Sequence, residues 1–463
     1  MSSKRRATPI STPVQPFNLP NYDEKLDFAK LALQDSEFSA LLDSNHGTFS
    51  FHEPEHVLQL TKSLLMRDFG LKLKLPNDRL CPPIPIRWCY VRWIQGLIDS
   101  TSDKYFIGYD PSRQVLGIDV GVGSSCIYPL LACTARPSWN FIGTDIDDKN
   151  FNHAVYNATN NNLDRRITLV KTLPYEPFWN LEKLKIEKAD FTMCNPPFFE
   201  SKEEMMSTYD KDIAPHATCT GAEVEMITRG GETAYVSRMI DESKSIGTKI
   251  QWFTSQLGMA RSLPVLVEQL KEHGCSNWVV GVLNPNARTR RWVIGWSWSD
   301  LKPSNDIARN EEVNAPQMWP TEVWIETSHT KEALVSSVNN TLDELELDWS
   351  YDPGNYTGLG ISKGNVWSRH ARRKKKRELQ GMSTTEPSSK SAKTAPSISS
   401  PMPSTDEAIA EMVFRVSIAE GVVTLRLLKS LNTLLWESFC TMMRSKVTDK
   451  WKKDEDTPME DRK

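Results

Sequence analysis

The sequence has few features of a metal site, a membrane span or a secreted protein. Its eight cysteines include no CxxC pair and no cysteine–histidine cluster, so their spacing argues against zinc and favours reduced thiols inside a cell. No apolar run approaches the roughly 18 residues that span a membrane. The first residues, MSSKRRATPISTP, are not followed by the apolar stretch of a secretory signal. We therefore expect an intracellular protein that binds neither metal nor membrane.

The charge of the chain is almost balanced. Its 56 basic and 59 acidic side chains give a formal net charge of −3. A nucleic-acid surface must then come from local clusters of Lys and Arg rather than from an overall positive field. The densest cluster, Arg369–Arg377, is typical of a nuclear-import signal, an RNA contact or a solubilising tail. Because of this cluster we expect a nuclear protein, with some cytoplasmic presence possible.

A large α/β domain is predicted from the alternation of short apolar runs with amphipathic stretches. The candidate strands are Val115–Val120, Phe141–Thr144, Ile167–Val170, Phe191–Cys194, Gln251–Thr254 and Trp278–Val282. Helical patterns between most of them imply a parallel sheet with helices on both faces. Trp278–Leu283 and Trp292–Trp298 are separated only by a short polar loop, which predicts an antiparallel hairpin.

Composition changes along the 463 residues predict further segments around this domain. A smaller C-terminal α/β module is expected from the strand pattern at Thr321–Glu326 and those at Val413–Ile418 and Val422–Leu427, with a Ser/Thr/Pro-rich stretch as a disordered insertion. The predicted segments are a disordered basic arm (1–22), the large domain (23–300, with a helical extension to about 110), a linker (301–319), the C-terminal module (320–450, interrupted at about 369–407) and a charged tail (451–463).

The first candidate binding motif is Gly117-Ile-Asp-Val-Gly-Val-Gly123, which leaves the first predicted strand. Gly121 and Gly123 lack a Cβ, so the backbone can turn tightly and approach a ligand, although such glycines often serve packing alone. Asp145 ends the second predicted strand, where a carboxylate can accept hydrogen bonds from ribose hydroxyls. The diphosphate-binding GxGxxG pattern is absent. The motif therefore indicates a nucleoside cofactor without a diphosphate.

The second motif, Asn195-Pro196-Pro197-Phe198, directly follows a predicted strand. The side-chain oxygen of Asn195 and the carbonyl oxygen of Pro196 can accept hydrogen bonds from an aromatic amine and aim the nitrogen lone pair at a methyl donor. The two prolines fix that geometry, and Phe198 offers a face for a base taken out of its stack. A rigid turn is the alternative. Together with the glycine motif, the tetrapeptide favours methyl transfer to an amine, catalysed mainly by positioning.

Roughly residues 25–300 resemble the methyltransferase-like protein 16 family. The resemblance rests on strings such as RLCPPIPIRWCYVRW, GIDVGVGSSCIYPLL, MCNPPFF and Gly230-Gly231-Glu232. It implies a Rossmann-like class I methyltransferase fold, S-adenosyl-L-methionine (SAM) as cofactor, and methylation of adenine N6 in U6 small nuclear RNA or messenger-RNA hairpins. Adenine in ribosomal RNA, guanine N2 and a protein glutamine stay open as acceptors. So does a regulator that uses this domain as a scaffold.

The resemblance also implies roles for individual residues and partners. Arg87 would bind the cofactor's carboxylate. Asp145, at a position where we expect the longer Glu, would bind its ribose. A loop with Lys171 and Thr172 would gate the pocket. The expected cofactor-binding residues are Arg87, Gly121, Gly123, Ser125, Asp145, Thr172 and Asn195, and the expected catalytic residues are Asn195, Pro196, Pro197 and Phe198. The expected partner is a structured RNA bound by a monomer, also through the C-terminal module.

RNA contacts are expected at several basic residues and at Phe199. The list is Arg79, Lys171, Phe199, Arg288, Arg290, Arg372, Arg373 and Lys374. For the arginines of the hairpin loop, which include Arg291, a solvated turn is an equal alternative to phosphate contact.

Overall fold

The computed structural model describes residues 20–22, 26–44, 47–209, 221–283, 290–371, 373 and 411–449. The chain divides into two compact units, residues 1–318 and 319–463, and each is considered by itself. The basic arm predicted at 1–22 and the tail predicted at 451–463 lie almost entirely outside the described residues.

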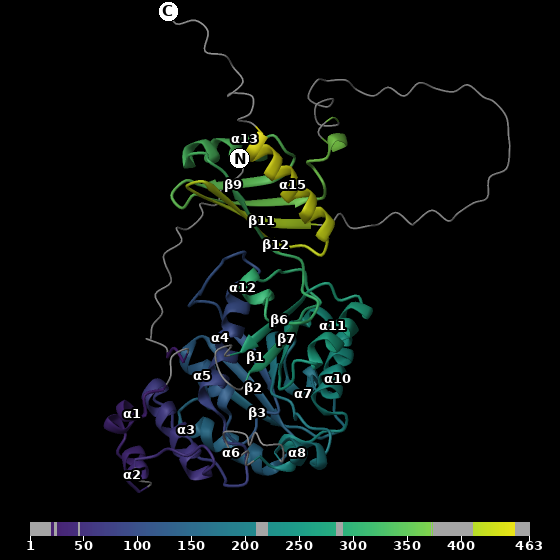
Figure 1. Ribbon diagram of the computed structural model, residues 1–463. Helices are drawn as coiled ribbons and strands as arrows, with labels where there is room; N and C mark the ends of the chain where they lie inside the picture. The colour runs from purple at the N-terminus through teal and green to yellow at the C-terminus, as the bar shows by residue number, and fades with distance from the viewer. Residues whose placement is uncertain are drawn as a thin grey trace, which may run out of the picture. The chain divides into compact units, whose positions relative to one another are not determined.

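Among the described residues, four helices precede the sheet of the first unit (Figure 1). They are α1 (Phe28–Gln34), α2 (Ser36–Ser44), α3 (Pro54–Phe69) and α4 (Ile84–Asp99). Local signals explain their ends. The Asp27 side chain accepts a hydrogen bond from the Lys30 N–H and caps α1, while Gly70 ends α3 in the left-handed conformation at φ +65°. The predicted helical extension is therefore present.

Seven strands form the sheet of the first unit, in the order β3-β2-β1-β4-β5-β7-β6. They are β1 (Val115–Val120), β2 (Trp139–Asp145), β3 (Ile167–Lys171), β4 (Ala189–Cys194), β5 (Ile250–Leu257), β6 (Trp278–Leu283) and β7 (Arg291–Trp296). The first five are parallel, and β7 is antiparallel to both β5 and β6. The parallel sheet with a terminal hairpin is thus confirmed, and it is a Rossmann-like α/β fold.

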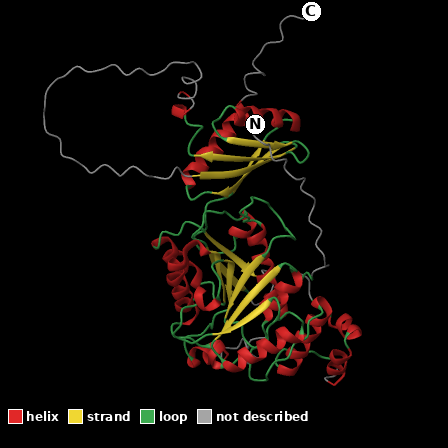
Figure 2. Ribbon diagram, turned by 180° about the vertical axis from the view of Figure 1, so that it is seen from behind, coloured by secondary structure: helices red, strands yellow, loops and turns green. Residues whose placement is uncertain are grey.

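Helices cover both faces of this sheet (Figures 1 and 2). They are α5 (Ile127–Ala135), α6 (Asp148–Asn160), α7 (Leu181–Leu184), α8 (Lys202–Tyr209), α9 (Glu223–Met226), α10 (Gly231–Ile246), α11 (Ser262–Glu272) and α12 (Asn305–Ala308), with the 3₁₀ turn Gly247–Lys249. Strand residues alternate between two apolar cores: Phe141 faces the core with α4 and α5, whereas its neighbour Ile142 faces the core with α10 and α11.

Of the segment predicted as a linker (301–319), residues 301–318 belong to the first unit instead. It contains α12, and Ala308, Val313 and Met318 are buried there. Because these apolar side chains have a core to enter, the polar composition around them misled the prediction. The unit boundary follows Met318.

The second unit is a five-stranded antiparallel sheet in the order β8-β12-β11-β10-β9, with α13 and α15 packed on one face. Its elements are β8 (Glu322–Glu326), α13 (Lys331–Asp343), β9 (Asp348–Asp352), β10 (Thr357–Lys363), β11 (Glu411–Ala419), β12 (Val422–Lys429) and α15 (Thr433–Asp449). Strand β11 pairs with β10, and β12 pairs with β8. The segments on either side of the predicted insertion therefore share one sheet.

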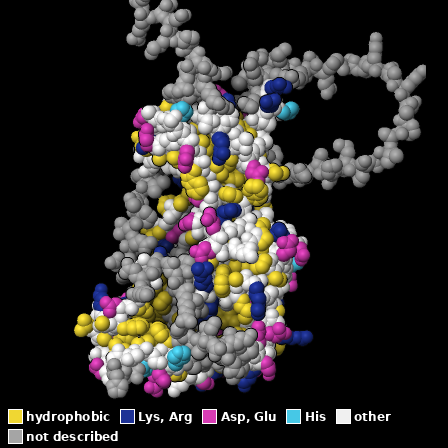
Figure 3. Space-filling model, viewed as in Figure 1, with side chains coloured by type: hydrophobic (Ala, Val, Ile, Leu, Met, Phe, Trp, Pro, Cys, Tyr) yellow, Lys and Arg dark blue, Asp and Glu magenta, His cyan; other side chains and the backbone are white. Residues whose placement is uncertain are grey.

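Within the described part of the chain, none of the helices has the length and apolar composition to cross a membrane. Those residues also contain no group of three or more His, Cys, Asp or Glu side chains arranged to hold a metal ion. Figure 3 shows basic and acidic side chains interspersed on the visible face of the described residues, as the balanced composition leads one to expect.

Candidate active site

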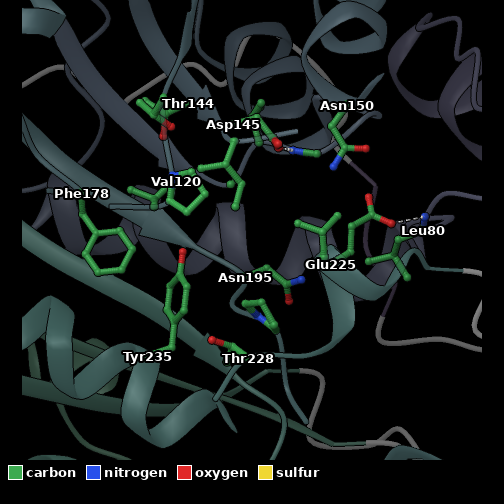
Figure 4. Close-up of a pocket in the computed structure, with 18 of the residues that line it drawn as sticks. Leu80, Val120, Thr144, Asp145, Asn150, Phe178, Asn195, Glu225, Thr228 and Tyr235 are labelled. Carbon is green, nitrogen blue, oxygen red and sulfur yellow. Dashed lines mark hydrogen bonds between the residues drawn. The ribbon is translucent and has the colours of Figure 1, made fainter. Parts of the chain in front are cut away.

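A cavity of about 430 Å³ opens where β1, β2 and β4 end (Figure 4). In an open parallel sheet, ligands bind at this edge because loops from neighbouring strands diverge there. Its walls include six of the predicted cofactor residues and their neighbours: Arg87, Gly121, Gly123, Ser125, Asp145 and Thr172. Asn195 and Pro197 line it as well. Residues predicted from separate parts of the sequence therefore meet in one pocket.

The glycine turn is tied to the end of β2. The N–H groups of Gly121 and Val122 both donate to the carbonyl oxygen of Thr144, at 3.0 and 2.8 Å. Gly121 and Gly123 have φ of +73° and +65°, a conformation that only glycine adopts without strain. Space is open around Gly121, whereas a Cβ on Gly117 would lie 2.5 Å from Cζ of Phe191. The motif thus contains two glycines that line the cavity and one that serves packing.

Asp145 is fixed beside this turn. Its two carboxylate oxygens accept hydrogen bonds from the N–H of Gly123 (2.9 Å) and from the N–H of Asp147 (2.8 Å). The residue is buried, and burial raises the pKa of its carboxyl group. Each oxygen keeps a further lone pair, so the side chain can still accept hydrogen bonds from a diol. The Glu225 carboxylate faces the same pocket from α9 (Figure 4).

Arg87 forms the opposite wall and has an unusual set of partners. Its side chain is almost fully buried, and its Nη1 donates to Tyr128 Oη (2.7 Å), Asn195 Oδ1 (2.8 Å) and Gln256 Oε1 (3.2 Å). Among the described residues, its hydrogen bonds therefore all go to neutral oxygens. A buried guanidinium favours an anionic partner. A ligand carboxylate would supply that partner.

These features fit SAM, which carries a ribose diol at one end and an amino-acid carboxylate at the other. Asp145 can hold the diol, the glycine turn leaves room for the backbone to approach, and Arg87 can hold the carboxylate. Asp119 on β1 is not among the residues that line the cavity. Both its carboxyl oxygens lack a hydrogen-bond partner in the described structure, and burial raises its pKa well above the usual range.

Asn195 lies at the boundary between the pocket and the Pro-Pro turn. Its Oδ1 accepts hydrogen bonds from Arg87 Nη1 and Gln256 Nε2, both at 2.8 Å. Pro196 is buried, Phe198 and Phe199 are partly exposed, and these three side chains do not line the cavity itself. The tetrad therefore spans the edge of the pocket, with Asn195 inside and Phe198 beyond it.

The Phe198 ring is held from two sides. A Cβ on Gly258 would lie 2.9 Å from Phe198 Cδ1, and the guanidinium of Arg291 lies 5.5 Å from the ring centroid. Glu232 holds the Gly258 loop, because its carboxylate accepts from the N–H groups of Gly258 (2.5 Å) and Met259 (3.0 Å). Glu232 of the Gly-Gly-Glu string thus fixes a loop against Phe198 of the Asn-Pro-Pro-Phe tetrapeptide.

Phe199 is held through its backbone. Its N–H donates to the Met226 carbonyl oxygen (3.0 Å), and its own carbonyl accepts from the N–H of Thr228 (2.9 Å). The short bridge connects the tetrad to the segment after α9.

Two of the residues predicted to contact RNA, Arg79 and Lys171, already have partners within the protein. Arg79 is 8% exposed, and its guanidinium donates to Asn150 Oδ1 (2.8 Å), Asp78 Oδ2 (2.9 Å) and Asp147 Oδ1 (3.1 Å). The structure therefore gives Arg79 a buried structural role and does not support a contact with RNA phosphates. Lys171 is half-buried at the end of β3, where it binds the Ile146 carbonyl oxygen at 2.8 Å.

Other predicted contacts are on the surface or lie outside the described residues. Arg290 is exposed and pairs with Glu312 at 3.1 Å, and Arg373 is exposed. Arg288, Arg372 and Lys374 lie outside the described residues. Contacts of these residues with RNA stay predictions.

Sequence reasoning missed several polar residues of the site. Tyr128, Glu225 and Tyr235 line the pocket, and Gln256 lies behind it, where it contacts Arg87 and Asn195. Tyr128 lies in the GIDVGVGSSCIYPLL string, which could have indicated it. Gln256 is a buried polar residue on β5, in a segment where apolar residues are expected, and that is the signal that could have found it.

Comparisons with known proteins agree with this geometry. A family model described as RNA methyltransferase matches residues 10–300. The U6 small nuclear RNA (adenine-(43)-N(6))-methyltransferase of Schizosaccharomyces pombe is 33% identical over 331 residues, which cover 71% of this chain and 83% of that protein. The RNA N(6)-adenosine-methyltransferase mettl16 of Danio rerio is 29% identical over 461 residues, or 91% of this chain and 95% of that protein.

A solved structure gives the same result for the fold. The hMettl16 catalytic domain in complex with the MAT2A 3′UTR hairpin 1 is 32% identical, with a TM-score of 0.53, and the match covers 64% of this chain and 96% of that one. The chain therefore belongs to this family of RNA methyltransferases, as its resemblance to methyltransferase-like protein 16 predicted.

Proposed function

We propose that this protein transfers the methyl group of SAM to N6 of an adenine in structured RNA, with U6 small nuclear RNA as the first candidate substrate. The observation that carries the proposal is the position of Asn195, which lies at the edge of the cavity that Asp145 and the glycine turn line, with Phe198 directly beyond it. The choice of RNA rests on similar proteins: one relative is a U6 small nuclear RNA adenine-N6 methyltransferase, and a structural neighbour is in complex with the MAT2A 3′UTR hairpin 1.

The residues of the chain act by positioning. SAM, when bound, supplies an electrophilic methyl group. Asn195 Oδ1 and the Pro196 carbonyl oxygen accept the two N–H bonds of the adenine amine, which directs the nitrogen lone pair towards the pocket. Phe198 provides an aromatic face for the flipped base, and Arg291 and Gly258 keep that ring in place. The amine loses its proton readily once it is alkylated, so a strong base is not required.

Methyl transfer from labelled SAM tests the proposal. The full-length protein and Asn195→Ala are incubated with U6 RNA, a messenger-RNA hairpin and ribosomal RNA, and the products are identified by nucleoside mass spectrometry. We expect N6-methyladenosine in U6 RNA and a loss of roughly 100-fold or more in the variant, as for other preorganised polar groups that act on a reacting centre. Asn160→Ala, an exposed residue at the end of α6, is the matched control.

The outcomes separate the alternatives. Label in ribosomal RNA, or on another base, would refute U6 adenine as the substrate while leaving the chemistry intact. Binding of SAM without methylation of any RNA would contradict the enzymatic function and favour an RNA-binding regulator.

We also propose that the protein acts as a monomer in the nucleus and that the second unit contributes to RNA binding. Support comes from the basic cluster Arg369–Arg377 at the entry to the insertion. A fluorescent fusion without these residues that still accumulates in the nucleus would contradict the role of this cluster in nuclear location. Unchanged RNA affinity after removal of residues 319–463 would contradict RNA binding by the second unit.

A further inference from the structure

We infer that Gln256 is a positioning residue that holds the Asn195 amide in its reactive orientation, and that the amide becomes available to adenine only after the cofactor has engaged Arg87. The inference rests on the proposed function and adds to it a residue and an order of binding. Gln256 lies on β5 and is 1% exposed. It is therefore a buried amide whose hydrogen bonds must be met inside the protein.

Its contacts form a closed network around Asn195. Gln256 Nε2 donates to Asn195 Oδ1 at 2.8 Å, and Gln256 Oε1 accepts from Tyr128 Oη at 3.2 Å and from Arg87 Nη1 at 3.2 Å. Arg87 in turn donates to Asn195 Oδ1 at 2.8 Å. Four polar side chains, from α4, α5, β5 and the loop after β4, therefore form one hydrogen-bond network around the Asn195 carboxamide.

The orientation of both amides follows from Arg87. A guanidinium has donors but no acceptor, so the atoms of Asn195 and Gln256 that face it must be their oxygens. The nitrogen of Gln256 then faces Asn195 Oδ1, as the 2.8 Å contact shows. Neither amide can turn by 180° without placing an N–H group against an N–H group.

This arrangement leaves Asn195 Oδ1 with no free lone pair. A carboxamide oxygen accepts two hydrogen bonds, and Arg87 and Gln256 supply both. The adenine amine needs one of these positions. Arg87 is the partner that can leave, because a hydrogen bond from a guanidinium to a carboxylate is roughly twice as strong as one to a neutral oxygen. The cofactor carboxylate would draw Arg87 away, and Gln256 would then hold the amide alone.

Two consequences distinguish this model from a purely structural role of Gln256. First, SAM or its demethylated product, S-adenosylhomocysteine (SAH), should tighten the binding of RNA that carries the adenine amine. Second, this coupling should need both the amine and Gln256. One gained hydrogen bond corresponds to a tightening of about fivefold.

The coupling can be measured directly with the full-length protein. The dissociation constant of a U6 RNA fragment is determined by fluorescence anisotropy with and without saturating SAH, for RNA with adenine or with purine at the methylated position. Purine lacks the exocyclic amine. For the wild type we expect SAH to tighten binding of adenine RNA about fivefold and of purine RNA by less than twofold.

Gln256→Met is the decisive variant, since Met fills a similar volume but cannot donate to Asn195. For this variant we expect the ratio of the RNA dissociation constants without and with SAH to fall to about one for both RNAs. Its kcat should fall roughly tenfold, with SAH affinity little changed. Ser255→Ala is the matched control: Ser255 is the buried neighbour of Gln256, and its hydroxyl donates to the Gln256 backbone carbonyl rather than to the Asn195 side chain. It should retain the coupling of the wild type.

Gln256→Glu tests the same inference if the Met variant does not fold. A carboxylate there would pair with Arg87 and cannot donate to Asn195, so SAH affinity and kcat should both fall by roughly tenfold. Lowering the pH should restore activity relative to the wild type, because a protonated Glu can donate again. Wild-type coupling and kcat in either folded variant would overturn the inference. Absence of adenine methylation by the wild type would instead refute the proposed function.

Discussion

Two glycines of one motif should respond differently to the same substitution, because only one of them faces the cavity. Gly117→Ala places a Cβ 2.5 Å from Phe191 Cζ and 2.8 Å from Phe141 Cε1, both buried rings in the sheet core. Overpacking of this kind costs about 1–3 kcal/mol of unfolding free energy. For a unit of about 300 residues, 2 kcal/mol corresponds to a drop in Tm of about 3 °C. The cavity is untouched, so SAM affinity of the folded variant should stay within about twofold.

Gly121→Ala should affect the cofactor instead. Nothing lies within 4 Å of the added Cβ, because that space is the pocket, but Gly121 has φ +73°. A non-glycine residue in this conformation costs about 1–2 kcal/mol. Gly70→Ala, at φ +65° and also in open space at the end of α3, is matched for this strain and lies outside the residues that line the pocket. Both variants should lose a similar amount of stability.

Calorimetry and thermal melting check both parts. We expect SAM affinity to fall more than tenfold in Gly121→Ala and to be unchanged in Gly70→Ala and Gly117→Ala. If Gly117→Ala weakened SAM binding tenfold while keeping the wild-type Tm, the division of the motif into ligand-facing and packing glycines would be wrong.

Two further predictions concern the Phe198 wall and a buried lysine. Gly258→Ala pushes a Cβ to 2.9 Å from Phe198 Cδ1, so kcat on RNA should fall roughly tenfold with SAM affinity unchanged; equal kcat would show that the ring can move freely. Burial lowers the pKa of Lys302 to about 8. Between this pH and the ordinary lysine pKa, the unfolded state binds more protons than the folded state. The free energy of unfolding should therefore rise by about 2–3 kcal/mol over this range. Urea unfolding of Lys302→Met should lack this rise, and an identical pH profile would contradict the assignment.

The parts of the fold that follow from local pattern could be predicted from the sequence. The strands of the first unit, the hairpin, and the meeting of Gly121, Asp145 and Asn195 all follow from apolar periodicity and from the rule that parallel strands end at one edge. Strand β10 could not be found in this way, because Gly358 and Gly360 interrupt its apolar pattern. In the structure these glycines make room for the rings of Trp349 and Phe414, which lie 2.1 and 2.2 Å from the positions that their Cβ atoms would take.

The hydrogen-bond partners of buried side chains could not be predicted from the sequence, for a different reason. Arg79 and Arg87 are both arginines near one Pro-rich turn, and nothing in their spacing separates a structural residue from a ligand-binding one. The partners decide: Arg79 meets carboxylates of the chain itself, whereas Arg87 meets neutral oxygens. Apart from Asp78, these partners lie more than 40 residues away in the sequence, so only the folded structure brings them together.

The anchoring of the pocket has a consequence for regulation. In the proposed binding mode, Asp145 and the glycine turn would hold the ribose and Arg87 would hold the amino-acid end of SAM, parts that the reaction leaves unchanged. The same contacts therefore retain the demethylated product, SAH, nearly as firmly as they retain SAM. Turnover should then be governed by product inhibition, and the rate of RNA methylation in the cell should follow the ratio of SAM to SAH rather than the concentration of SAM alone.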